Sequence, residues 1–382
     1  MTSLEQTLEG ARILLCVGHG GVGKTTIAAS LATWAARHGR KTAVLTVDPA
    51  QRLKDALGLG RGRGEGPRRV SLASLGRAGR GGHLDAYLLD VKRTFDELIV
   101  GLATPEQARI ILENRLYQNL SGSLAGTAEY MAVERVYRLA AEGGYDLVVV
   151  DTPPARHAVD FLDAPRRLLA LLESRVFGIL KDPTSILPAA GSRLAHFVLD
   201  SVLRGLERFT GIGLVREVGD FVRAIDTLSV ALAARIRAVQ ATLTGPGTAL
   251  VLVAAPEPRL VGETGALVEA LARTRLSIGG IVVNRSLPRA LFEESAADAA
   301  VLNGLPAGLV ARLRRAHADL QGLAARQEAV LAPLVAKARA PIVGRVPLMA
   351  AGPGTLAELA TIGAHLFPEA DEPPARARGL AQ

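Results

Sequence analysis

The chain has 382 residues, of which 49% are hydrophobic, 21% charged and 4% aromatic, with a formal net charge of +8 and one cysteine. This composition is typical of a globular protein, and a single cysteine excludes a disulfide or a multi-cysteine zinc site within one chain. The apolar runs are too short for a membrane span, and the first residues do not resemble a secretory signal, so we expect a cytoplasmic protein. We attribute the positive net charge to the frequent use of Arg that is typical of proteins from high-GC bacterial genomes. Because the Arg-rich stretch at 60–69 lacks interleaved aromatics, we do not expect nucleic acid as a partner.

Strand and helix patterns alternate from the start of the chain. Residues 11–17 predict a buried strand, residues 24–38 a helix that ends at Gly39, and residues 41–48 a strand that ends on an acid. Such a unit requires parallel strands. The Gly- and Arg-rich residues 58–82 predict a mobile loop. Further strands are predicted at 83–90, 145–151, 248–256, 277–285 and 340–348, and a closing helix at 355–366.

The stretch between the first strand and the first helix matches a phosphate-binding loop. Gly18, Gly23, Lys24 and Thr25 satisfy G-x-x-x-x-G-K-[ST] in the required strand–loop–helix context. Glycines let backbone N–H groups turn toward an anion, and the helix N-terminus adds its dipole. Lys24 is expected to reach the β- and γ-phosphates, and the Thr25 hydroxyl to reach Mg²⁺. The predicted phosphate-contacting residues are Gly20, Gly21, Val22, Gly23, Lys24, Thr25 and Thr26.

Two acids end predicted strands near this loop. Asp151 closes the apolar strand YDLVVVD, the usual place for an acid that holds Mg²⁺, and Asp48 closes the strand after the loop's helix. Acids at the C-terminal edge of parallel strands face the ligand crevice. We therefore predict Thr25, Asp151 and Asp48 around the metal.

These patterns predict an α/β fold: a mostly parallel P-loop NTPase sheet flanked by helices, with an inserted helical subdomain. Residues 1–164 are expected to form the N-terminal half of the ATPase domain, 165–243 the helical subdomain, and 244–367 the C-terminal half with a helical hairpin at 289–337. The Pro-rich residues 368–382 predict a disordered tail.

Several motifs of the chain resemble those of a known family. GGVGKTT (20–26), TVDPAQRLKDALG (46–58) and DTPP (151–154) resemble the ArsA family of deviant-Walker ATPases, which includes the arsenite-pump ATPase and the ATPase that targets tail-anchored membrane proteins. The likeness continues in AAPEPRLVGETGALVEAL (254–271), GGIVVNR (279–285) and VPLMAAGPGTLAEL (346–359), so it spans most of the chain in order.

The resemblance implies roles for matching positions. Asp48 would orient the attacking water, Asp151 would lie by Mg²⁺, Asn284 would contact adenine, and the loop from Pro347 would lie along the base. It also implies ATP and ADP as ligands and a dimer that sandwiches nucleotide. Because the chain holds one such unit, it should pair with a second chain, either its own copy or a paralogous ATPase.

His19 is a departure from the family pattern. The family has a "signature" lysine at this position, which reaches across the dimer to the partner's nucleotide. Histidine is shorter and only part-charged near neutral pH. Three interpretations stay open: the ATPase is slow, a lysine-bearing partner supplies the charge in a heterodimer, or His19 or a nearby arginine such as Arg156 substitutes.

The cysteine and methionine counts are further departures. Arsenite sites need soft thiolates, so the lone Cys16 argues against arsenite transport and excludes a zinc-stapled dimer. Only three methionines are present. The Leu-, Val- and Phe-rich residues 165–243 either pack as an ordinary helical subdomain or offer an apolar surface to a protein client or, peripherally, to a membrane.

The leading hypothesis is a Mg²⁺-dependent ATPase that acts as a nucleotide-driven dimer switch on a protein or membrane-linked client. Alternatives are a partition or positioning ATPase on DNA or membrane, and a slowly hydrolysing regulatory subunit of a heterodimer. The sequence does not identify the client or choose between homodimer and heterodimer.

Overall fold

A computed structural model of residues 1–382 describes residues 4–47, 66–75, 81–114, 117–118, 127–174, 223–274, 276–288, 305–349 and 354–367, with a few isolated positions between them. Several sequence predictions lie outside the described residues. They are Asp48 with its D-P-A stretch, the middle of the expected helical subdomain (175–222), the first part of the expected hairpin, and the tail at 368–382.

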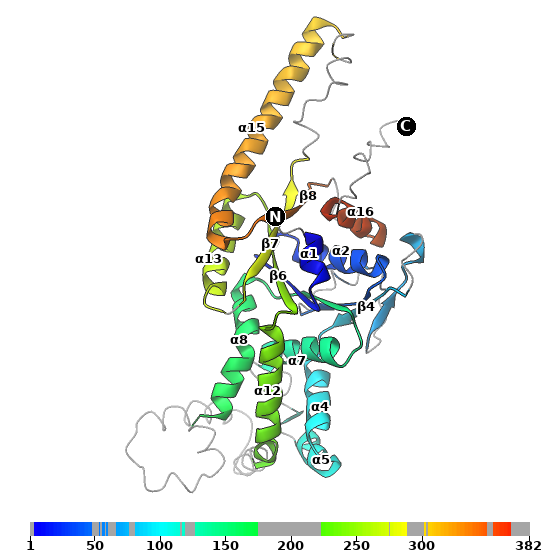
Figure 1. Ribbon diagram of the computed structural model, residues 1–382, viewed down its shortest axis with the longest axis vertical. Coiled ribbons are helices and arrows are strands. Elements are labelled where there is room, and N and C mark those ends of the chain that lie inside the picture. The colour runs from blue at the N-terminus through cyan, green and yellow to red at the C-terminus, as the bar shows by residue number, and fades with distance from the viewer. Residues whose placement is uncertain are drawn as a thin grey trace, which may run out of the picture. The chain divides into compact units, whose positions relative to one another are not determined.

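One eight-stranded sheet forms the centre of the fold, in the order β3-β4-β2-β5-β1-β6-β7-β8 (Figure 1). Every neighbouring pair is parallel except β3 and β4. The predicted mostly parallel α/β sheet is thereby confirmed. The strands are β1 (Ile13–Gly18), β2 (Lys41–Thr46), β3 (Arg68–Val70), β4 (His83–Leu88), β5 (Leu147–Asp151), β6 (Thr248–Ala254), β7 (Ile278–Ser286) and β8 (Ile342–Pro347).

Helices alternate with these strands along the chain. The compact unit that holds the sheet contains α1 (Leu4–Glu9), α2 (Lys24–Arg37), α13 (Pro258–Leu271), α15 (Ala307–Ala338) and α16 (Leu356–Leu366). A second unit contains α4 (Val91–Leu102), α5 (Pro105–Glu113), α12 (Ser229–Leu243) and most of α7 (Thr127–Ala141) and α8 (Ala155–Leu172). Helix α15 is one continuous helix of 32 residues where the sequence predicted part of a hairpin. Among the described helices, none combines the length and apolar composition needed to cross a bilayer.

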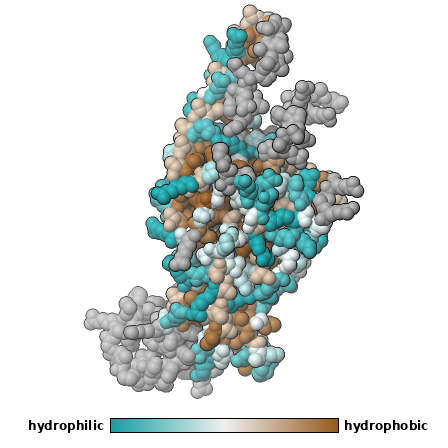
Figure 2. All heavy atoms as spheres, viewed as in Figure 1, coloured by the Kyte–Doolittle hydropathy of each residue, from teal (hydrophilic) through white to brown (hydrophobic). Residues whose placement is uncertain are grey.

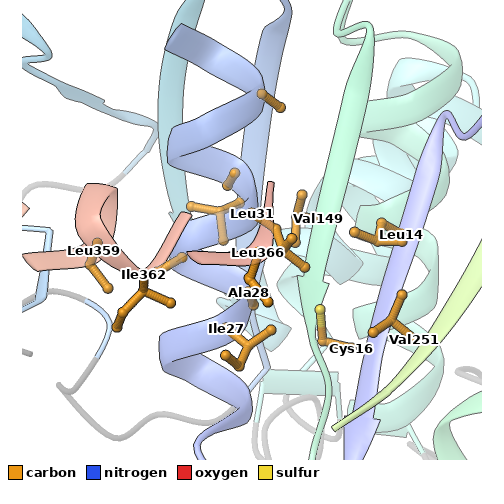
Figure 3. Packing of buried hydrophobic residues seen from close by; sticks show 14 of the residues in the cluster. Leu14, Cys16, Ile27, Ala28, Leu31, Val149, Val251, Leu359, Ile362 and Leu366 are labelled. Carbon is orange, nitrogen blue, oxygen red and sulfur yellow. The ribbon is translucent and has the colours of Figure 1, made fainter. Parts of the chain in front are cut away.

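The main core lies between the sheet and the pair of helices α2 and α16. Figure 3 shows Leu14 and Cys16 of β1 on the same side as Ile27 and Leu31 of α2 and Ile362 of α16. All six residues of β1 are buried, including those that point to the opposite face. A central parallel strand that is buried on both faces is expected to be apolar throughout, which explains the run ILLCV.

The Gly- and Arg-rich stretch contains structure that the sequence did not predict. Residues 58–82 were expected to form a loop, but Arg68–Val70 add the antiparallel edge strand β3 to β4. Asp85 of β4, which is 5% exposed, holds this strand by accepting hydrogen bonds from Arg69. The Tyr145 hydroxyl donates to the same carboxylate at 2.8 Å. The pairing depends on contacts distant in sequence, so a local composition pattern could not reveal it.

The chain divides into two compact units. Unit 1 contains residues 1–88, 138–159 and 244–382, and unit 2 contains residues 89–137 and 160–243. The sequence analysis placed residues 89–137 with the ATPase half, whereas the structure groups them with the helices that follow. The reason is packing: buried residues of α4, α7, α8 and α12 share one core, namely Leu98, Tyr130, Met131, Ala164, Leu232 and Ile236.

Candidate functional site

The loop between β1 and α2 has the backbone of an anion cradle. Gly23 has φ of 92°, a left-handed conformation that L side chains rarely adopt, and it directly precedes the first residue of α2. At Gly18 a Cβ atom would collide with the Val253 carbonyl oxygen of β6. At Gly20 and Gly21 the space that a Cβ would take has no neighbouring atom within 4 Å, so the tip of the loop is open. Glycine is therefore required by close contacts at Gly18 and Gly23 and by a left-handed φ of 85° at Gly21, while the centre of the loop leaves room for a ligand.

Asn284, near the end of β7, supports the loop from beneath. Its Nδ2 donates to the Val22 carbonyl oxygen at 2.9 Å, and its Oδ1 accepts from the Arg285 N–H at 2.9 Å. A Cβ at Gly23 would collide with the Asn284 amide. Asn284 thus fixes the loop's backbone, a contact that the sequence did not predict. Its expected contact with adenine stays a prediction.

Lys24 folds back over the loop. The side chain is 8% exposed, and Nζ donates to the His19 carbonyl oxygen at 3.0 Å. A lysine held this way has its charge beside the loop's open centre, where an anion would lie. The predicted role of Lys24 in holding phosphate is compatible with this position.

Thr25, Asp151 and Thr46 meet at the carboxyl edge of the sheet. The Thr25 hydroxyl donates to Asp151 Oδ2 at 2.7 Å, and the Thr46 hydroxyl donates to the same oxygen at 3.1 Å. Asp151 is 1% exposed and ends β5, while Thr46 ends β2. Two of the three predicted metal residues therefore lie side by side, and Asp48, two residues beyond Thr46, lies outside the described residues.

This donor set suits a small hard cation. Mg²⁺ prefers oxygen ligands and takes few of them from protein, usually one or two carboxylates plus substrate phosphates. The Thr25 hydroxyl and the Asp151 carboxylate are such oxygens, and they already face each other. Among the residues that the structure describes, no group of three or more His, Cys, Asp or Glu side chains is placed to hold a metal by itself. The residues present thus fit a cation shared with a bound phosphate.

His19 is engaged within its own chain. Its Nδ1 lies 2.8 Å from the Gly20 carbonyl oxygen, and its Nε2 forms an ion pair with Glu263 of α13. Both partners of the imidazole are therefore acceptor oxygens of the same chain. Arg259, one turn earlier on α13, contacts the other Glu263 oxygen at 3.3 Å. The imidazole therefore points to α13 in the same chain.

Sequence reasoning missed both Thr46 and Glu263. Each lies in a stretch quoted for its family likeness, yet nothing in the local pattern distinguishes a hydroxyl or an acid that faces the loop. The strand-end position of Thr46, two residues before Asp48, was the one available signal. Glu263 lacked such a signal, because its contact with His19 depends on how α13 packs beside the loop.

The remaining predicted position is Pro347, the last residue of β8. Beyond it, the Leu348 N–H donates to the Ser286 carbonyl oxygen at 2.8 Å, and the Ser286 hydroxyl donates to the Val346 carbonyl oxygen at 3.1 Å. These bonds hold the ends of β7 and β8 together, close in sequence to Asn284. Thr26 lies in the first turn of α2, partly exposed.

Comparison with known proteins assigns these features to one family. Residues 11–299 match the ArsA family model, described as an anion-transporting ATPase. The chain is similar to "ATPase get3" of Aspergillus terreus (30% identity, 50% of this chain and 54% of the relative). It is also similar to "ATPase GET3" of Phaeosphaeria nodorum, with 26% identity over 71% of this chain and 75% of the relative.

A third relative has a different name. A protein of Halobacterium salinarum named for an arsenical pump-driving ATPase is 34% identical over 41% of this chain, which covers 24% of that protein. The chain thus spans less than two thirds of the length of several relatives that it matches.

Proposed function

The chain belongs to the ArsA family of anion-transporting ATPases, and on that premise we propose that it is a Mg²⁺-dependent ATPase whose nucleotide state controls a dimer. The observation that carries the proposal is the group Lys24, Thr25 and Asp151 beside an open glycine loop. Phosphoryl transfer needs positioning and charge neutralisation rather than a nucleophilic side chain. The chain supplies both at this edge of the sheet.

The residues have separate tasks in this proposal. Backbone N–H groups of residues 20–26 and the α2 dipole would hold the phosphates. Lys24 Nζ would exchange the His19 carbonyl for phosphate oxygens, and Thr25 with Asp151 would hold Mg²⁺. Bound Mg²⁺ would neutralise charge on the phosphates. By family resemblance, Asp48 would orient the attacking water and Asn284 would contact adenine.

Isothermal titration calorimetry with Mg-ATP tests the proposal. Lys24→Ala should weaken binding by about 100-fold, because a buried charge-assisted contact is lost, and phosphate release should stop. Lys92→Ala is the matched control, since Lys92 is an exposed lysine whose ion pair is an i,i+4 contact with Asp96. Equal ATP binding by both variants, or no binding by the wild type, would refute the proposal.

A slowly hydrolysing regulatory subunit is the second candidate, and one observation favours it. His19, at the position of the family's trans-acting lysine, is tied to Glu263 of its own chain. Tight ATP binding with negligible phosphate release, restored by a lysine-bearing paralogue, would support this candidate over the first.

We also propose that unit 2 handles an apolar protein client rather than arsenite. Burial raises the pKa of the Cys16 thiol, and the nearby Asp151 raises it further, so Cys16 is a poor thiolate ligand. Unit 2 exposes large apolar side chains, with Val230 83% exposed and Leu171 53% exposed. A fluorescent apolar helical peptide should bind the wild type several-fold more tightly than Val230→Ser/Leu171→Ser. Unchanged affinity would remove unit 2 from the proposal.

A further inference from the structure

Helix α15 has two halves with different environments. Its second half is fastened to unit 1: Gln327 Oε1 accepts from the Leu287 N–H at 3.0 Å, Glu328 pairs with Arg345 at 2.9 Å, and Leu331 and Leu334 are buried. Its first half, from Ala307 to about residue 326, consists largely of exposed positions. In Figure 1 this half runs away from α13 and β7, and Figure 2 shows apolar and hydrophilic residues side by side on its surface.

The leucines of α15 concentrate along one stripe that runs through both halves. Steps of four and three residues alternate through 309, 313, 316, 320, 323, 327, 330 and 334, which is the 3.5-residue spacing of a coiled-coil seam. Seven of these eight positions are apolar, and they hold five of the helix's six leucines, with the sixth, Leu331, adjoining the stripe. The seam is buried at its C-terminal end, but Leu309, Leu313 and Leu323 are 40%, 43% and 43% exposed.

Charged residues flank the exposed part of the seam. Arg312, Asp319 and Arg326 recur every seven residues on one side of it, the position that pairs with the same position of an antiparallel partner helix. Within the part of the chain that the structure describes, neither Arg312 nor Asp319 has an ion-pair partner. Both side chains are therefore free for a contact that a second helix would supply.

We propose that the first half of α15 is a self-association surface, on which a second copy of this chain docks its own α15 in antiparallel orientation. In one register the seam layers are Leu309 against Leu320 of the partner subunit and Leu313 against Ala316 of the partner subunit, each occurring twice by symmetry. The same register sets Arg312 opposite Asp319 of the partner subunit, again twice.

The charges select this arrangement over others. Sliding the helices by seven residues in either direction brings Arg312 against Arg312 of the partner subunit or against Arg326 of the partner subunit. Sliding them further toward the C-terminal end pairs Asp319 with Arg326 of the partner subunit. That register would place the partner's helix against the second half of α15, which already packs on its own chain. A parallel pair places Arg312 near His317 and Asp319 near Ala324, with no attraction. The stripe is also too narrow for the wide apolar face of a membrane-surface helix.

Cysteine cross-linking of the full chain tests the register. The native Cys16 is buried, so it should not react in this experiment. A mixture of Leu309→Cys and Leu320→Cys chains should form a disulfide between different chains on oxidation without nucleotide, while either variant alone should not. Cross-linking of Leu309→Cys alone would indicate a parallel pair and overturn the proposal. So would cross-linking that requires Mg-ATP, since this contact is independent of the nucleotide site.

A charge exchange tests the flanking pairs. In sedimentation velocity over about a hundredfold concentration range, Arg312→Glu or Asp319→Arg should each weaken self-association about fivefold, because two attractive pairs become repulsive. The double variant Arg312→Glu/Asp319→Arg should restore it. A wild type that stays monomeric over this range, or that instead binds anionic vesicles through α15, would refute the proposal.

Discussion

At the residue scale, the contact between His19 and Glu263 decides how the nucleotide loop can act. A lysine at position 19 would also lie near Glu263, so it would form an ion pair within the chain rather than reach a partner. The acid on α13 therefore opposes any trans role of position 19 until it is displaced or neutralised. Of the three interpretations of His19, this contact favours the first, an ATPase with low intrinsic turnover.

We expect His19→Lys alone to change turnover little and His19→Lys/Glu263→Gln to raise it about tenfold or more, since trans cationic residues in related chemistry contribute 10³-fold effects. Phosphate release at saturating Mg-ATP measures this. Glu269→Gln is the matched control, because Glu269 lies on the same helix but pairs with Lys337. If the double variant hydrolyses ATP no faster than His19→Lys alone, Glu263 does not restrain position 19.

The residues also show how far sequence patterns reach. The placement of Gly23, Lys24, Thr25 and Asp151 was predictable because it follows from a local motif or a strand end, and the structure brings them together. Their roles toward nucleotide and metal stay predictions. The Thr46 hydroxyl, the Glu263 carboxylate and the Asn284 contact with the loop were not. Each depends on which side chain a distant element presents, and that is determined by packing across the fold.

At the element scale, α7 and α12 are joined by a buried ion pair in unit 2. Arg235 of α12 contacts Glu134 of α7 at 2.7 and 2.9 Å, and Glu134 is fully buried. The Arg235 guanidinium also lies 4.2 Å from the Tyr137 ring. Removing one partner of such a pair leaves a desolvated charge without compensation.

Arg235→Ala should therefore lower the free energy of unfolding of unit 2 by about 3–5 kcal/mol, as measured by urea denaturation. Arg237→Ala on the same helix is the control, because Arg237 pairs with Glu173 at the surface and its loss should cost less than about 1 kcal/mol. Similar effects of the two variants would mean that the buried pair contributes no more than an exposed one.

Strands and helices differ in how well the sequence predicted them. The buried strands β1, β5 and β6 were evident as apolar runs between turn residues, since a strand covered on both faces needs no polar alternation. Edge strand β3 was not evident from the sequence, because its three residues, Arg68–Val70, do not form an apolar run. Asp85 of the neighbouring strand holds β3 in place through Arg69. The grouping of α4 and α7 with α12 was equally hidden, since an amphipathic helix does not specify its partner.

At the scale of the whole molecule, the chain folds as two units with separate cores. The core between α2, α16 and the sheet belongs to unit 1, and the core around Tyr130 and Ile236 belongs to unit 2. Helices α7 and α8 run across the division, and α8 begins four residues after Asp151. The glycine loop, Asp151 and Asn284 all lie in unit 1. Asp151 is bonded to the loop through Thr25, and Asn284 through the Val22 carbonyl.

This division makes a prediction about independence. Arg235→Ala should increase amide hydrogen exchange across α7 and α12, yet Mg-ATP affinity should stay within about twofold of the wild type, because the hydrogen bonds given above for the loop join residues of unit 1. Mg-ATP at 100 times its dissociation constant should still stabilise unit 1 by about 2.7 kcal/mol. Exchange mass spectrometry with and without nucleotide, combined with calorimetry, measures both quantities. If Arg235→Ala abolishes ATP binding while exchange at the loop rises in step with α12, the two units fold as one, and the nucleotide site depends on the helical unit for its shape.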